Sequence, residues 1–261
     1  MNERPMATGG ETVTVRRDVR LGLVTPSSNT ALEPEAWRLV SDVHASVPIS
    51  LHVSRVRVTK IADDAASSAQ FDMAPMEAAA ELLGDARVDA VAWAGTSGSW
   101  LGIDHDRLLC KGLSQAAGAP ATTSTLAMLS ACEVLGAQRV AVVTPYTTDI
   151  VERICSVYEA QGLTIVGEAH LGITENWAFG QVGSDELGGL VDRAAKGKPD
   201  AVLVVCTNLR AGTLAVALEE RVGAPLVDST FATVWHALLL TGQSLAVTGH
   251  GRLIEVGLRQ A

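Results

Sequence analysis

Cys206 is the residue whose position gives it the widest choice of chemistry. It follows the apolar run Ala201–Val205 and precedes Thr207 and Asn208, where a strand would end and a helix begin. Amides at a helix start stabilise a thiolate, so this thiol could act as an acid, a base or a nucleophile. Free cysteines are also among the most buried residue types, so a purely structural role stays open. The other cysteines lie inside helical patterns, where we expect core or inert thiols: Cys110, Cys132 and Cys155.

A glycine-rich loop, residues 95–99, is the second candidate. Its sequence, Gly-Thr-Ser-Gly-Ser, lacks the lysine of a GxxxxGK[ST] loop and the spacing of a GxGxxG loop, which argues against nucleotide binding. Its amides and hydroxyls could instead converge on a carboxylate whose charge grows during a reaction. A simple glycine-rich turn explains the composition equally well, and both interpretations stay open.

Other common catalytic groups have weaker support. The six histidines are scattered, and no pair has metal-ligand spacing on one helix face. His105 is expected to cap a helix, and His236 beside Trp235 is expected to pack on one. No GxSxG motif marks a serine nucleophile. The sequence therefore predicts neither a metal site nor a Ser-His-Asp triad.

Three stretches of the first half recur in the second half in the same order. Arg20–Pro26 returns as Arg139–Pro145, and the stretch from Val88 to Ser97 returns as that from Pro199 to Asn208. Gly-Ala-Pro followed by Ser-Thr also occurs twice, from Gly118 and from Gly223. A duplicated chain folds as two similar lobes. We expect these lobes to face each other across a cleft, with Gly95 opposite Cys206.

Short apolar strands alternate with amphipathic helices along both halves. This alternation predicts an α/β fold of two pseudo-symmetric flavodoxin-like lobes, each a parallel four-stranded sheet flanked by helices, with the active-site cleft between them. The expected strands are Val19–Thr25, Leu51–Val58, Val88–Trp93, Ala121–Thr123, Val140–Thr144, Thr164–Ala169, Ala201–Val205 and Leu226–Val227. The expected helices are Ala31–Val40, Met73–Leu83, Asp104–Ala117, Thr125–Leu135, Thr148–Gln161, Asp185–Ala195, Ala211–Arg221 and Phe231–Leu240.

Helix start signals and strand ends locate the site. Asn29 and Thr30 precede the first helix, and Ser124 and Ser229 precede a matching pair of helices. Ligands of parallel sheets bind beyond the carboxyl ends of the strands. The loops there are rich in hydroxyls, amides and free N–H groups but not in charge, which suits a small carboxylate held by neutral donors.

Domain boundaries follow from the repeat. We expect residues 1–17 to form a disordered tail, residues 18–137 an N-terminal α/β lobe, and residues 138–261 a C-terminal α/β lobe. Part of the C-terminal segment is expected to pack on the N-terminal lobe.

Composition narrows the partners. The net charge is −9 and there is no run of Lys or Arg, which argues against nucleic acid or an anionic membrane as a partner. No apolar run is long enough to span a bilayer, and the N-terminal segment lacks the apolar stretch of a secretory signal. We therefore expect a cytoplasmic protein with reduced cysteines.

The loops resemble the aspartate/glutamate racemase superfamily, and most closely its maleate isomerase and arylmalonate decarboxylase branch. The resemblance extends from about Arg20 over nearly the whole chain. It rests on the motifs Thr-Pro-Ser-Ser-Asn-Thr, Ala-Gly-Thr-Ser-Gly-Ser, Thr-Pro-Tyr-Thr, Gly-Ile-Thr-Glu-Asn and Val-Cys-Thr-Asn-Leu-Arg, which contain Asn29, Gly95, Tyr146, Asn176 and Cys206. A homodimer and a reaction without cofactor are what this resemblance implies.

Glycine at position 95 is the informative departure. The resemblance implies a cysteine there in maleate isomerases, and two cysteines in racemases. Arylmalonate decarboxylases resemble this chain in having glycine first and a single cysteine second. Loss of the first thiol is expected to leave space and backbone donors at Gly95. The retained asparagines Asn29 and Asn176 instead follow the isomerase pattern, which favours a small polar dicarboxylate over an aryl malonate.

The sequence therefore favours a cofactor-independent decarboxylase that acts on a malonate-like or small dicarboxylic acid. Cys206 would be the catalytic acid that protonates the enediolate. One alternative is a maleate cis-trans isomerase-like enzyme, and a further one is a non-catalytic carboxylate-binding homologue. Racemisation ranks below all three. The residues expected to bind the carboxylate substrate are Ser27, Ser28, Asn29, Gly95, Thr96, Ser97, Tyr146, Asn176 and Thr207.

Overall fold

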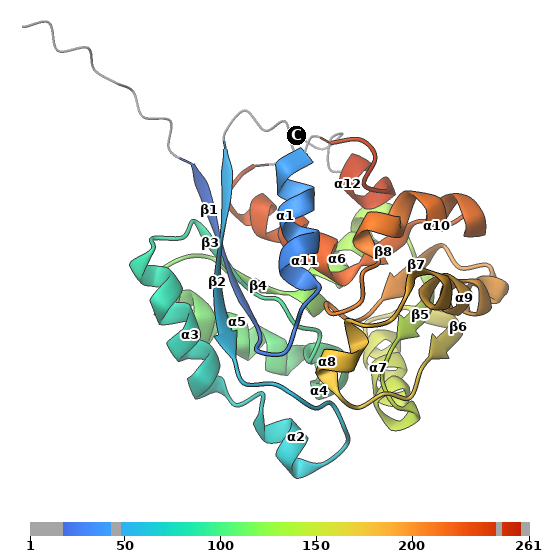
Figure 1. Cartoon of the computed structure of the whole chain (residues 1–261), viewed down its shortest axis with the longest axis horizontal. Coiled ribbons are helices and arrows are strands. Elements are labelled where there is room, and N and C mark those ends of the chain that lie inside the picture. Colours follow the sequence, from blue (N-terminus) through green and yellow to red (C-terminus); the bar gives the residue numbers. More distant parts are fainter. Residues whose placement is uncertain (1–17, 43–47, 244–246, 257–261) are drawn as a thin grey trace, which may run out of the picture.

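The computed structural model describes residues 18–42, 48–243 and 247–256, so the predicted tail, residues 1–17, lies outside the described residues. The strands form two parallel four-stranded sheets, ordered β2-β1-β3-β4 and β6-β5-β7-β8. Helices flank both sheets (Figure 1). The predicted α/β class is confirmed, and both halves of the repeat have the same strand order.

All the expected strands form, with ends shifted by a few residues at most. The first sheet contains β1 (Val19–Pro26), β2 (Ile49–Val56), β3 (Ala90–Trp93) and β4 (Ala121–Thr123). The second contains β5 (Arg139–Thr144), β6 (Thr164–His170), β7 (Ala201–Val204) and β8 (Leu226–Asp228). Every residue of β3 and β7 is buried. These inner strands are continuous apolar runs because helices cover both faces of such sheets.

The repeat also shares a side-chain contact at the start of the inner strands. Asp89 precedes β3, and its Oδ2 accepts a hydrogen bond from the N–H of Arg20 at 2.9 Å. Asp200 has the matching place before β7, and its Oδ2 accepts from the N–H of Arg139 at 2.8 Å. Each carboxylate thus joins two adjacent parallel strands.

The long helices form where the sequence predicts them. They are α1 (Leu32–Asp42), α3 (Met73–Asp85), α5 (Ile103–Ala117), α6 (Ser124–Leu135), α7 (Thr148–Ala160), α9 (Ser184–Ala194), α10 (Ala215–Val222) and α11 (Ser229–Leu240). The α10 helix starts later than predicted because Gly212–Leu214 forms a 3₁₀ turn first. The short helices were not predicted, since about one turn shows no apolar period. They are α2 (Ala65–Ala69), α4 (Gly98–Leu101), α8 (Asn176–Phe179) and α12 (Arg252–Val256).

The capping residues of α6 and α11 differ from the prediction. Ser124 and Ser229 are the first helical residues, and the caps are the preceding Thr123 and Asp228. The Thr123 hydroxyl accepts from the N–H of Leu126 at 3.1 Å. Both strands end at the cap itself, so each helix begins without an intervening loop.

The helices α6 and α11 connect the two sheets. They pack against each other, and the hydroxyls of Ser124 and Thr233 lie 2.7 Å apart. The α11 helix contacts β1, β3 and β4 of the first sheet, whereas α6 contacts β7 and β8 of the second. In Figure 1 the red-orange α11 accordingly lies beside α1. The two sheets therefore share packed helices, and the domain boundary after residue 137 stays a prediction.

Thr123 provides a test of this arrangement. Its hydroxyl caps α6 and donates to the buried carboxylate of Asp106. Thr123→Ala removes both bonds, so we expect the free energy of unfolding to fall by about 1–2 kcal/mol. Urea denaturation followed by circular dichroism measures the loss. Thr123→Ser keeps the hydroxyl and is the matched control; equal losses in both variants would contradict the proposed role of the hydroxyl.

Candidate active site

A small cavity lies where the strand ends of the two sheets meet. Its volume is about 20 Å³. Gly95, Thr96 and Ser97 follow β3 and line it on one side, and Cys206 and Thr207 follow β7 and line it as well. Tyr146 and Asn176 complete the polar lining. The remaining lining is apolar or aromatic and comprises Pro26, Val58, Ile61, Phe71, Trp93 and Trp100. The predicted pairing of Gly95 and Cys206 in one cavity is therefore present in the structure.

The thiol of Cys206 is held in its protonated form. Its side chain is 2% exposed, and burial raises its pKa to about 12. A hydrogen bond from the Tyr146 hydroxyl and the N–H groups of Asn208 and Leu209 act in the opposite direction. The amides at the helix start thus lower the pKa of the thiol, as expected, but desolvation raises it by more. At neutral pH, Cys206 is an acid with a proton to give.

Tyr146 joins the two sides of the cavity. Its hydroxyl lies 2.9 Å from that of Thr96 and also hydrogen-bonds Cys206. Burial holds the pKa of Tyr146 well above its usual range, so the phenol stays neutral. Its ring meets Trp100 and Phe179 edge-on, each with centroids 5.3 Å apart. This packing fixes the position of the phenol oxygen.

Trp93 overturns one expectation about Gly95. A Cβ placed on Gly95 would lie 2.5 Å from two ring carbons of Trp93, far inside normal contact. The absent thiol therefore leaves no free space, because the Trp93 indole occupies it. The indole Nε1 donates to the Ser97 hydroxyl at 2.9 Å. The sequence interpretation missed this residue, although side chains two apart on a strand point to the same side.

Three of the predicted substrate ligands are absent from the cavity lining. Ser27 is exposed and is absent from the cavity lining. The Ser28 hydroxyl donates to the carbonyl of Val58 and accepts from the amide of Asn176 at 2.8 Å. Asn29 uses its oxygen to cap the start of α1. The structure thus gives Ser28 and Asn29 contacts that support the site and do not point into it.

Hydrogen bonds between the lobes hold the Cys206 loop in place. The Thr207 hydroxyl accepts from the amide of Asn29 at 3.1 Å and donates to the carbonyl of Ala94 at 3.1 Å. Asn208, which was not predicted, accepts from the N–H groups of Thr30 and Ala31 at 2.9 and 3.1 Å. The repeat could have predicted a role for Asn208, because it matches the predicted site residue Ser97 of the first half.

A strap from the first lobe closes over the cavity. Ile61 donates its N–H to the carbonyl of Thr174 at 2.8 Å, and Asn176 donates to that of Thr59 at 2.9 Å. Arg153 of α7 forms an ion pair with Asp63 of the strap at 2.7 Å. These bonds attach residues 59–63 to the second lobe and explain why the cavity is small.

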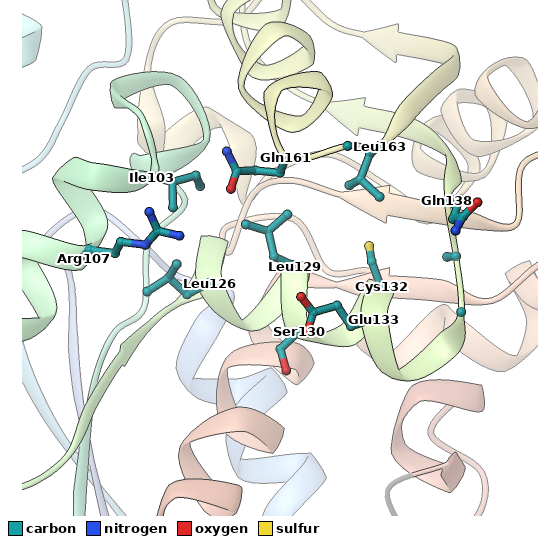
Figure 2. Close-up of a pocket in the computed structure, with 13 residues that line it drawn as sticks. Ile103, Arg107, Leu126, Leu129, Ser130, Cys132, Glu133, Gln138, Gln161 and Leu163 are labelled. Carbon is teal, nitrogen blue, oxygen red and sulfur yellow. The ribbon is translucent and has the colours of Figure 1, made fainter.

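A larger groove lies elsewhere on the molecule. It has a volume of about 560 Å³ and lies between the start of α5, the length of α6 and the end of α7 (Figure 2). Its lining mixes apolar and polar side chains, including Leu126, Leu129, Arg107, Glu133 and Gln161. None of the predicted site residues lines it. Size alone therefore does not identify the reacting centre, and the small cavity keeps that assignment.

The described residues contain neither a metal-binding cluster nor a membrane-spanning helix. Within 18–42, 48–243 and 247–256, no group of three or more His, Cys, Asp or Glu side chains could hold a metal ion. Within the same ranges, no helix is both long and apolar enough to cross a bilayer.

Sequence and structure comparisons identify the family. A model of the arylmalonate decarboxylase family matches residues 21–254, so the chain belongs to that family. It is similar to a maleate isomerase of Pseudomonas putida, with 28% identity over 247 residues that cover 90% of this chain and 97% of the relative. It is also similar to an arylmalonate decarboxylase of Bordetella bronchiseptica, with 34% identity over 169 residues that cover 63% and 70%.

Solved structures agree with this assignment. The crystal structure of the maleate isomerase Iso from Pseudomonas putida S16 superposes with a TM-score of 0.85 at 25% identity. The superposition covers 92% of this chain and all of that chain. The resemblance inferred from the loops is confirmed, and the chain belongs to a family that contains both decarboxylases and isomerases.

Asp228, the cap of α11, gives the stability of the fold a testable pH dependence. Burial raises its pKa from 3.8 to about 8, and the charge of Glu35 acts in the same direction. The folded protein therefore keeps a proton that the unfolded chain releases between these two values. The free energy of unfolding accordingly falls as the pH rises from 3.8 to about 8.

Asp228→Asn should remove this dependence, because an amide oxygen can still accept from the N–H of Phe231 but carries no charge. We expect the variant to gain stability relative to the parent as the pH increases, with a plateau above about 8. Urea denaturation of both proteins at pH 5, 7 and 9 measures the difference. A constant difference across the three pH values would contradict the assignment.

Proposed function

We propose that the protein is a cofactor-independent decarboxylase that acts on a malonate-like or small dicarboxylic acid. One observation carries the proposal: a buried, protonated thiol at Cys206 lies in the same cavity as Gly95, where the other half of the repeat offers no thiol. Such a cavity can deliver a proton to one side of a planar intermediate. Two-sided proton exchange, as in racemisation, would need a second acid or base at that position.

The polar side of the cavity suits the carboxylate that remains on the substrate. The Ser97 hydroxyl accepts from Trp93, so its own hydrogen is available for a substrate oxygen. The hydroxyls of Thr96 and Tyr146 bond each other and can rotate toward a bound anion. Neutral donors in a dry site stabilise charge that grows during the reaction.

The apolar side suits the carboxylate that leaves. Val58, Ile61 and Phe71 offer it no hydrogen-bond donor from their side chains, so the leaving group loses its solvation there. The carbon–carbon bond breaks, carbon dioxide departs, and the electron pair passes into an enediolate. Cys206 then transfers its S–H proton to the carbon.

The resulting thiolate has partners at hand. The Tyr146 hydroxyl and the N–H groups of Asn208 and Leu209 bond the sulfur and lower its pKa relative to burial alone. They would stabilise the thiolate until it takes a proton from solvent. The same groups thus leave Cys206 protonated at rest and make its deprotonated state accessible during turnover.

A maleate cis-trans isomerase-like activity is the alternative. The similarity to the Pseudomonas putida maleate isomerase, which extends over 90% of the chain, favours it. That activity would use Cys206 alone for the covalent step. It would require a thiolate nucleophile, and a pKa of about 12 opposes the formation of one. A non-catalytic carboxylate-binding protein is the further alternative, and it would bind diacids without converting them.

Incubation with malonates in heavy water tests the proposal. Proton NMR should show a monoacid that carries deuterium on the carbon next to the carboxylate. Cys206→Ala should lower the rate at least 100-fold, since a general acid typically contributes 10²–10⁴. Cys132→Ala is the matched control, because Cys132 is also buried with a raised pKa but lies outside the cavity lining.

Each other outcome favours a different function. Full activity of Cys206→Ala would contradict the role of the thiol. Production of fumarate from maleate, without decarboxylation of malonates, would establish the isomerase alternative. Binding of diacids with neither product would establish the non-catalytic one.

A further inference from the structure

The Trp93 indole occupies the space in which a side chain at position 95 would lie. Trp93 is fully buried at the end of β3 and lines the cavity. The nearest atoms to a Cβ on Gly95 are indole Cε2 and Cζ2 at 2.5 Å and Nε1 at 2.9 Å. Gly95 does not have a positive φ, so its backbone would accept a side chain. The indole is the nearest obstacle to one.

The indole is fixed in this position. Its Nε1 donates to the Ser97 hydroxyl at 2.9 Å, and its ring meets Phe71 edge-on with centroids 6.4 Å apart. Moving the ring aside would leave a buried N–H without a partner and open a void against Phe71. Trp93 therefore forms a rigid wall of the cavity.

The repeat shows how this wall replaces a thiol. In the second half, the residues that match Trp93 and Gly95 are Val204 and Cys206. Each pair combines two residues on the same side of an inner strand or its extension. One half places a medium residue before a thiol, and the other places a very large residue before no side chain. In the first half, the bulky side chain is therefore on the last strand residue, Trp93, and position 95, where the second half has its thiol, carries no side chain.

We propose that Trp93 is the specificity-determining residue of the site and limits substrates to diacids with hydrogen or a small alkyl group on the reacting carbon. An aryl group facing Gly95 would need the space that the indole occupies, because two indole carbons already lie 2.5 Å from the position of a Cβ there. This inference rests on the proposed function for its reaction. Its claim about size applies equally to binding.

A change in substrate selectivity tests the proposal. We expect the parent protein to favour methylmalonate over phenylmalonate, and Trp93→Leu to raise the phenylmalonate-to-methylmalonate ratio of kcat/KM at least tenfold. Trp93→Phe, which keeps a ring against Phe71, should raise it in the same direction by less. Trp235→Leu is the matched control, because it removes a buried indole that lies outside the cavity lining and should leave the ratio unchanged.

The ratio does not depend on how much of each variant is folded. An unchanged ratio in both Trp93 variants, or a parent that accepts the two acids equally, would overturn the proposal. If no malonate is decarboxylated, the proposed function fails but this inference stays testable. Calorimetric titration with the same two acids should then show the same shift in the ratio of affinities, and its absence would overturn the inference.

A second readout needs no substrate. Gly95→Ala adds only the Cβ that meets the indole, so it should lower the Tm of the parent protein. In the Trp93→Leu background, whose shorter side chain can withdraw, the loss of Tm should be less than half as large. Equal losses in the two backgrounds would show that Trp93 does not exclude a side chain at position 95.

Discussion

The Thr207 hydroxyl is the point on which the geometry of the cavity depends. It receives a hydrogen bond from Asn29 and gives one to the carbonyl of Ala94, and both partners belong to the first sheet or its following loop. Thr207 itself follows Cys206, so the thiol is held against the loop that begins at Gly95. Asn208 strengthens the connection by accepting from the N–H groups that begin α1. The cavity is thus set by bonds between the lobes.

Neutral groups dominate the polar lining of this cavity. Its polar residues are hydroxyls, an amide and a thiol, and no lysine, arginine or carboxylate is among them. A charged donor would hold an anion more strongly, but it would also stabilise the substrate carboxylate before reaction. Hydroxyls and N–H groups in a dry site add most where charge increases. These neutral groups agree with the proposed decarboxylation, in which negative charge passes from the leaving carboxylate to the enediolate while the total charge stays constant.

Much of the framework could be predicted from the sequence, because the strands are apolar runs and the repeat supplies a second copy of each signal. The juxtaposition of Gly95 and Cys206 followed from the same repeat. Ser28 and Asn29 show the limit of that reasoning: a loop can carry the right residues and yet direct them at its own helix or at another loop. Trp93 shows the opposite limit. The two-residue period of the strand implied that Trp93 lies beside Gly95. Only the direction of the indole in the structure shows that it blocks a side chain at position 95.

The large side chain of Trp93 accompanies the missing side chain at Gly95. The two halves of a duplicated site can therefore differ in a neighbouring residue as well as in the reacting residue. A second thiol at position 95 could not persist beside the indole, since the Cβ would already overlap it. Conversely, an indole at position 204 would crowd the thiol of Cys206, because both residues lie on the same side of the chain. The two arrangements therefore exclude each other within one half of the repeat. A chain that adopts one in each half has a thiol on one side of the cavity and an aromatic wall on the other. Under the proposed decarboxylation, the direction of proton delivery would follow from packing as much as from chemistry.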